Sequence, residues 1–142
     1  MLRKSRGTNA ERDLVNQFWE NDYACIRSPS SGGGTKYPRP DLIAGSVKYG
    51  RTIAIELKTS RSESIYIQED QIKGLKEFAN TFGAEIWFAV KFIGKRTGFR
   101  FFAITSKKLH WTRSGNCKID LQMAKENGLP IETFFQMEEE EE

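Results

Sequence analysis

The side chains best placed to do chemistry are two carboxylates and one ammonium group: Asp41, Glu56 and Lys58. Residues 52–59 are apolar and β-branched, which predicts a strand, and on a strand Glu56 and Lys58 project from the same face because they are two positions apart. Residues 41–44 predict a second short strand, and an antiparallel hairpin of the two brings Asp41 beside Glu56. Paired carboxylate oxygens bind hard divalent cations, and a neighbouring lysine can stand beside a phosphate or an attacking water.

The same three residues also have a purely structural interpretation. Glu-x-Lys is common on strands, and an exposed cross-strand ion pair contributes at most about 1 kcal/mol. On spacing alone this structural interpretation is favoured over a metal site. The rest of the chain therefore decides between the two.

The overall composition excludes several classes of protein. The chain has 142 residues, 38% hydrophobic and 29% charged, as in an ordinary globular domain. Two cysteines without a Cys-x-x-Cys pair make no disulfide framework, and a single histidine argues against a zinc site. No apolar run is long enough to cross a membrane, and the basic start leads into no signal-peptide core. We therefore expect a cytoplasmic protein with no membrane partner and no small-molecule substrate.

Charge is unevenly distributed along the chain. The formal net charge is +3, and setting aside the five glutamates Glu138–Glu142 leaves +8 for the remainder. A basic body suits a polyanionic partner, of which nucleic acid is the usual one. We expect a single domain over residues 1–137, followed by an acidic and disordered tail over residues 138–142.

The predicted elements run in the order helix, three strands, helix, two strands. The first helix is expected from Thr8 to about Asn21, with Thr8 and Glu11 forming a capping box. The second is expected from about Gln68 to Phe82, where Gly83 stops it. The strands are expected at 24–27, 41–44, 52–59, 85–93 and 99–105, and residues 106–137 look less regular. This order predicts an α/β fold with a central mixed β-sheet flanked by helices.

Glu11 has two compatible roles. It lies on the apolar stripe of the first predicted helix, which should face the sheet. Its only role can be to close the capping box with Thr8. Alternatively, it can also place a third carboxylate at the rim of the Asp41–Glu56 pair. Position alone does not separate these roles.

The segment Ser28–Pro40 is the clearest loop in the sequence. Its three consecutive glycines suit a plain connector. It also ends directly on Asp41 and carries Arg27, Lys36 and Arg39 at its margins. A mobile basic loop in this place can close over a phosphodiester backbone, and we favour that interpretation.

Several stretches occur together in an order that is more specific than any one of them. They are Lys4–Asp13, Ile26–Ser28, Pro40–Gly45, Ala54–Lys58, Glu77–Gly83 and Ala89–Phe92. In this combination the chain resembles the archaeal Holliday junction resolvases, within the restriction-endonuclease-like nuclease superfamily, from about Arg3 to about Phe135. The resemblance implies a restriction-endonuclease-like fold and a homodimer. It also implies Mg²⁺-dependent paired cleavage of four-way DNA junctions in recombination and repair, with Mn²⁺ as a substitute ion.

The resemblance also implies roles for individual residues. The catalytic set it implies is Glu11, Asp41, Glu56 and Lys58, with Ser31 as a loop serine that the alignment also allows to be Ser30. The metal ligands would be Glu11, Asp41, Glu56 and the carbonyl of Leu57. The resemblance implies that Arg12 and Arg27 lie near the scissile phosphate. The basic N-terminal arm and the loop add Arg6, Lys36 and Arg39 to the expected DNA contacts.

An association face is expected on the second predicted helix, at Phe78 and Phe82. With Trp87 and Phe88 on the following strand, these rings are more aromatic surface than one small domain needs to bury. The family resemblance points to Phe78 and Phe82 as well. The alternative is that these rings lie in the core of one chain.

Two other functions stay open on the sequence. One is a restriction-like or repair nuclease that cuts ordinary duplex DNA, although 142 residues leave no separate target-recognition domain. The other is a non-catalytic junction-binding protein. Convergent carboxylates without a metal would repel phosphates, which disfavours that second function.

Overall fold

The computed structural model describes residues 5–29 and 37–138, with side chains from Asn9 onward, and its centre is a six-stranded mixed sheet. The strands are β1 (Ala24–Arg27), β2 (Leu42–Ser46), β3 (Arg51–Ser60), β5 (Glu85–Phe92), β6 (Phe99–Ala103) and β9 (Leu129–Pro130). They lie in the order β1-β2-β3-β5-β6-β9, and only β3 and β5 run parallel. The predicted α/β class with a mixed central sheet is confirmed.

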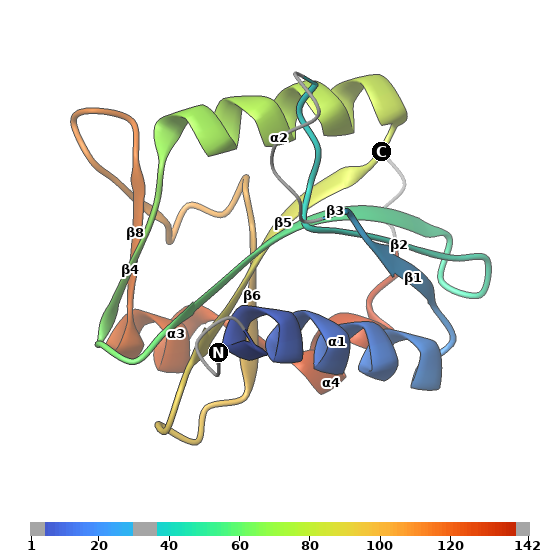
Figure 1. Cartoon of the computed structure of the whole chain (residues 1–142), viewed down its shortest axis with the longest axis horizontal. Helices are drawn as coiled ribbons and strands as arrows, with labels where there is room; N and C mark the ends of the chain where they lie inside the picture. Colours follow the sequence, from blue (N-terminus) through green and yellow to red (C-terminus); the bar gives the residue numbers. More distant parts are fainter. Residues whose placement is uncertain (1–4, 30–36, 139–142) are drawn as a thin grey trace.

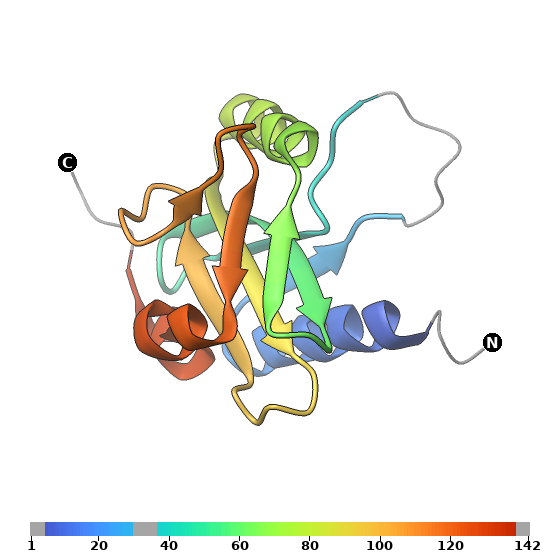
Figure 2. The ribbon, with the colours of Figure 1, turned by 90° about the vertical axis from the view of Figure 1, so that its left-hand side faces the viewer.

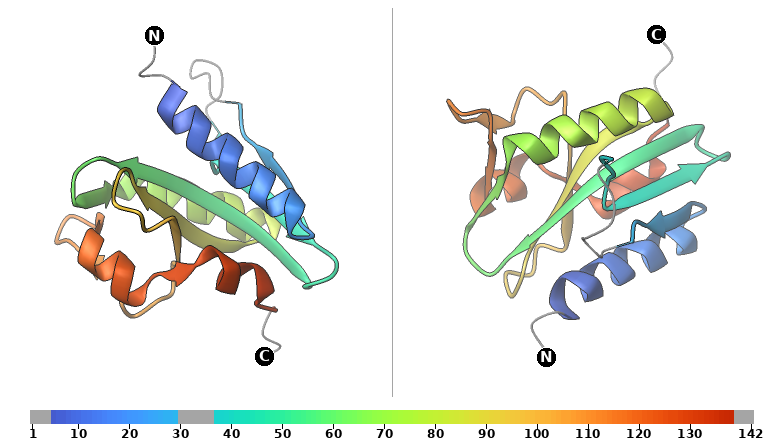
Figure 3. Two further views of the ribbon diagram at one scale, coloured as in Figure 1. Left: turned by 90° about the horizontal axis from the view of Figure 1, so that it is seen from below. Right: turned by 45° about the horizontal axis from the view of Figure 1, so that its top comes forward.

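A second, three-stranded antiparallel sheet stands beside the first (Figure 2). It contains β4 (Ser64–Ile67), β7 (His110–Trp111) and β8 (Cys117–Asp120), in the order β4-β8-β7. The helices are α1 (Ser5–Glu20), α2 (Glu69–Phe82), α3 (Leu121–Asn127) and α4 (Ile131–Gln136). Helix α2 covers one face of the large sheet, and α1 and α4 cover the other (Figures 1 and 3).

Two apolar cores follow from this layering. Phe18 of α1 and Phe134 of α4 pack with Phe101 against one face of the large sheet, and the Phe101 and Phe134 rings stack 4.0 Å apart. The other core lies between α2, the small sheet and the opposite face of the large sheet. Strand β5 is central and covered on both sides, as its apolar run over residues 86–90 predicts. Trp87 and Phe88 are therefore buried, 5% and 0% exposed, and the expectation that they add to an association face is wrong.

The first helix begins earlier than predicted, whereas the second agrees with the prediction. Helix α1 starts at Ser5, so Thr8 lies inside it, and the capping box with Glu11 is wrong. A helix that has formed extends at little cost while no proline stops it, and none stands between Ser5 and Thr8. Helix α2 ends at Gly83, whose φ of 92° is the left-handed cap that glycine adopts readily.

Residues 106–137 contain more regular structure than predicted. They form β7, β8, α3, β9 and α4, which are between two and seven residues long. Such short elements span too few residues for a periodic pattern to emerge from the sequence. In the described part of the chain, no helix has both the length and the apolar character needed to span a membrane.

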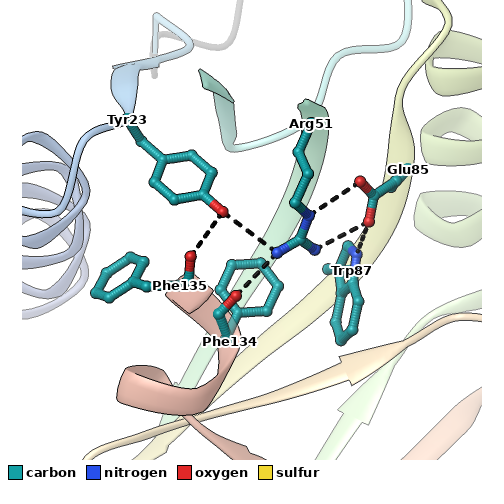
Figure 4. Close-up of polar contacts among 6 residues, drawn as sticks. All are labelled: Tyr23, Arg51, Glu85, Trp87, Phe134 and Phe135. Atoms are coloured by element: carbon teal, nitrogen blue, oxygen red, sulfur yellow. Dashed lines mark hydrogen bonds and ion pairs between the residues drawn. The ribbon is translucent and has the colours of Figure 1, made fainter. Parts of the chain in front are cut away.

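A buried arginine joins the starts of the two parallel strands (Figure 4). Arg51 on β3 donates to both carboxylate oxygens of Glu85 on β5, at 3.1 and 2.9 Å. Its third contact runs to the Phe134 carbonyl at 2.8 Å, and its guanidinium lies 4.5 Å from the centre of the Phe134 ring. The Tyr23 hydroxyl accepts from Arg51 and donates to the Phe135 carbonyl. This network ties α4 and the β1 side of the sheet to the β3–β5 pair.

We predict that Glu85→Ala lowers the free energy of unfolding by about 3 kcal/mol, because it leaves the Arg51 guanidinium buried without its carboxylate. Urea unfolding at neutral pH measures this. The control is Lys48→Ala, which breaks an exposed ion pair to Asp22 and should leave stability unchanged. Equal stability of the Glu85→Ala variant and the wild type would show that the network adds nothing.

Candidate active site

Asp41 stands immediately before β2, at the point where the chain enters the hairpin with β3. The antiparallel register pairs Leu42 with Ile55, and the Asp41 N–H donates to the Ile55 carbonyl at 3.0 Å. The Asp41 carboxylate in turn accepts a hydrogen bond of 2.7 Å from the Leu57 N–H. Both bonds bracket Glu56, so the hairpin brings Asp41 and Glu56 together as the sequence predicts.

Lys58 shares the strand face of Glu56. Its Nζ lies 3.5 Å from Glu56 Oε2, with 28% of the lysine side chain and 9% of the glutamate side chain exposed. The lysine is therefore reachable from solvent while the carboxylate beside it is nearly covered. An ammonium group in this position can donate hydrogen bonds to a ligand that enters the site from solvent.

The carboxylates oppose one another electrostatically. Burial raises the pKa of Glu56 to about 7, and the nearby Asp41 charge adds to this rise, while Lys58 opposes it. Burial also raises the pKa of Asp41, against the Leu57 N–H and Lys58, which lower it. One ammonium group thus does not balance two buried carboxylates.

Glu11 lies near this pair but is engaged elsewhere. Its carboxylate Oε1 is 3.6 Å from an Arg27 guanidinium nitrogen at the end of β1. Partial burial and the Asp41 charge raise the pKa of Glu11, and Arg27 lowers it. Across the described residues, no three acidic, histidine or cysteine side chains converge enough to hold one ion. Glu11 therefore stands at the rim of the pair, and its predicted role as a metal ligand stays a prediction.

The pair nevertheless fits a divalent cation. Two adjacent carboxylates supply the oxygen ligands that Mg²⁺ prefers, and Mg²⁺ usually keeps several waters, so it needs few protein ligands. A positive ion between Asp41 and Glu56 would also relieve the repulsion that raises the pKa of Glu56.

A cavity of about 280 Å³ opens beside the carboxylates. Its lining comes from the segment before β2, from β3 and from the first half of α2: Pro38, Arg39, Asp41, Glu56, Asp70, Gln71, Gly74 and Leu75. This volume is enough for several waters or a phosphate group. The sequence interpretation missed the contribution of α2, although a glycine inside a helix was a signal that another segment lies close.

Ser28 is a second residue that the sequence interpretation missed. Its hydroxyl donates to the Pro40 carbonyl, and its N–H donates to the Asp41 carbonyl at 2.9 Å. These bonds tie the segment that carries Asp41 to the end of β1. Ser28 therefore supports the carboxylate without facing it.

The predicted DNA-contacting residues are distributed unevenly. Arg12 is exposed on α1, Arg27 is 40% exposed at the end of β1, and Arg39 lines the cavity. The loop residues Ser30, Ser31 and Lys36 lie outside the described part of the chain, as does the side chain of Arg6. Their predicted roles stay predictions.

Comparison with known proteins identifies the family. The model of the archaeal Holliday junction resolvase (Hjc) family matches residues 2–142. The chain belongs to the archaeal Holliday junction resolvase family. Within it, the chain is 38% identical over 130 residues to the crossover junction endodeoxyribonuclease Hjc of Sulfurisphaera tokodaii, covering 91% of this chain and 85% of that protein. It is 40% identical over 102 residues to the Hjc of Archaeoglobus fulgidus, covering 71% of each chain.

A solved structure supports the same assignment. The 1.6 Å structure of Archaeoglobus fulgidus Hjc, a Holliday junction resolvase, superposes with a TM-score of 0.77 at 34% identity. The match covers 90% of this chain and 98% of that one. The resemblance seen in the sequence is thereby confirmed, together with the fold that it implies.

We predict that Glu56→Gln stabilises the protein at pH 8 in chelator. The pKa of Glu56 is raised in the folded state, so the stability that its protonated form contributes is present below about pH 4.5 and is lost as pH rises through about 7. The uncharged glutamine escapes this loss. Thermal unfolding at pH 4.5 and pH 8 should show a higher Tm for the variant only at pH 8.

The matched control for this prediction is Glu63→Gln, which removes an exposed carboxylate far less covered by protein. It should show no such pH-dependent gain. A Glu56→Gln variant that is no more stable than wild type at pH 8 would contradict the unbalanced charge of the site.

Proposed function

We propose that this chain is a structure-specific endonuclease that resolves four-way DNA junctions by paired phosphodiester cleavage. The curated relatives are named crossover junction endodeoxyribonucleases, and the family is that of the resolvases. The observation that carries the proposal is the Asp41–Glu56 pair with Lys58 3.5 Å from Glu56. These residues supply the two carboxylates and the lysine ammonium group that a metal-dependent nuclease needs. The carboxylates line a cavity on the protein surface.

Mg²⁺, with Mn²⁺ as a substitute, is the cofactor that this donor set suits. Asp41 and Glu56 would hold it, together with the Leu57 carbonyl. When bound, such an ion supplies Lewis acidity at the scissile phosphate and an acidified water.

The side chains around the pair perform the remaining tasks. Lys58 donates hydrogen bonds to the attacking water or to a phosphate oxygen, and its fixed positive charge stabilises negative charge that develops there. Glu11 acts from the rim on a water. Arg27 and Arg39 flank the site and bind the phosphates on either side of the cut, and Arg12 extends this basic surface along α1.

We propose that the protein acts as a homodimer through the C-terminal half of α2. Phe82 is 55% exposed, and its ring stacks on that of Phe78 with centres 5.2 Å apart. Phe82 also lines two shallow cavities, of about 270 and 320 Å³. A two-fold dimer would carry two active sites, which suits the two cuts that resolve a junction.

We predict that Asp41→Asn abolishes cleavage of a four-way junction, with a rate loss of about a thousandfold or more, because it removes one of two metal-binding carboxylates. Junction binding should persist or strengthen, because one phosphate-repelling charge is gone. The assay compares junction, duplex and single strand with Mg²⁺ and with chelator. The control is Asp22→Asn, which changes an exposed aspartate that follows α1 and lines no part of the cavity.

The same assay separates the competing functions. Cleavage of the junction far above that of duplex supports the proposal. Equal cleavage of both substrates indicates a duplex endonuclease, and tight junction binding without cleavage indicates a binding protein.

We predict that Phe82→Ala shifts the protein toward monomer in sedimentation experiments and turns paired incisions into single nicks. The Phe82 side chain is exposed in the isolated chain, so its removal should change the stability of each protomer little. The control is Tyr66→Ala, which removes an exposed ring on β4 and should leave the dimer intact. A Phe82→Ala variant that stays dimeric would remove this face from the interface.

A further inference from the structure

Gly74 occupies the interior of α2, where glycine is a poor helix former. Its backbone does not have the positive φ that would require glycine. The reason lies instead in a neighbour. A Cβ placed on Gly74 would stand 3.1 Å from the Cβ of Pro38, closer than the 3.5–4.0 Å at which carbon atoms pack favourably.

Pro38 cannot give way by rotating a side chain. Its ring is closed on the backbone, so a push on its Cβ moves the main chain. Downstream the chain is fixed: Pro40 is buried with its carbonyl held by Ser28, and Asp41 is bonded to β3. On this downstream side, a displacement at Pro38 falls on Arg39, the residue between Pro38 and the part that is held.

Arg39 lines the same cavity as Gly74, Pro38 and the two carboxylates. A shift of the Arg39 backbone therefore moves part of the wall of that cavity. It leaves the hydrogen bonds of Asp41 to Ile55 and Leu57 in place.

We infer that Gly74 is a positioning residue for the cleavage reaction, because its missing side chain lets Pro38 lie against α2 and so holds Arg39 at the Asp41–Glu56 cavity. Gly74 touches neither the carboxylates nor the DNA in this role. The inference rests on the proposed function, but the steric contact on which it depends can be tested without any cleavage assay.

The first test is Gly74→Ala in junction cleavage at saturating DNA and Mg²⁺. We expect a single-turnover rate lower by on the order of tenfold, as for a small misplacement of a group that orients the substrate. The Tm should not fall, because alanine favours the helix. Asn80→Ala, on the exposed side of the same helix, is the control and should cut at the wild-type rate. A wild-type rate for Gly74→Ala would overturn the inference.

The second test combines Gly74→Ala with Pro38→Gly, which removes the colliding carbon. In the Pro38→Gly background the alanine should change the cleavage rate less than about twofold, because coupled neighbours are not additive. The same loss in both backgrounds would overturn the inference.

Stability gives a readout independent of activity. Alanine at position 74 should raise the Tm more in the Pro38→Gly background than in the wild type, where the contact with Pro38 offsets the gain. Equal shifts in both backgrounds would refute the contact itself. A wild-type protein that cuts no junction under any divalent-metal condition contradicts the proposed function, while these Tm shifts still decide the contact.

Discussion

The register of the β2–β3 hairpin is the constraint on which the site depends. Because Leu42 pairs with Ile55, Asp41 before β2 lies beside Glu56 on β3. The Leu57 N–H donates to the Asp41 carboxylate and holds it in this position. A shift of one position would turn the side chains of a strand to the opposite face. Burial of the apolar residues on both faces of β3 makes that shift expensive, so the fold itself forces two carboxylates into one place.

The rest of the molecule holds this hairpin rigid and leaves one side of it open. At the far end of β3, Arg51 locks the strand to Glu85 and to α4 (Figure 4). Near the site, Ser28 ties the segment before β2 to β1. On the remaining side α2 forms a wall of the cavity, so that the carboxylates are covered by protein yet face a space for a phosphate.

Much of the site could be predicted from the sequence because its signals are local. Asp41, Glu56 and Lys58 follow from strand period and a single hairpin, and the left-handed cap at Gly83 follows from residue type. Ser28 and Gly74 could not be assigned a role in this way, because their contacts with the segment 38–41 lie outside any strand pairing: Ser28 bonds across a loop, and Gly74 approaches Pro38 from a helix. The start of α1 was misjudged because Thr8 and Glu11 fit a cap that helix extension overrides. The short elements after Ala103 carry no periodic signal.

We propose that Asp41 and Glu56 together hold a divalent ion at the scissile phosphate. Anomalous diffraction from crystals containing Mn²⁺ and uncut junction DNA tests this most directly. We expect a manganese peak within coordination distance of both carboxylates and of a DNA phosphate. A peak that contacts neither Asp41 nor Glu56, in crystals of protein that cuts junctions in solution, would contradict it.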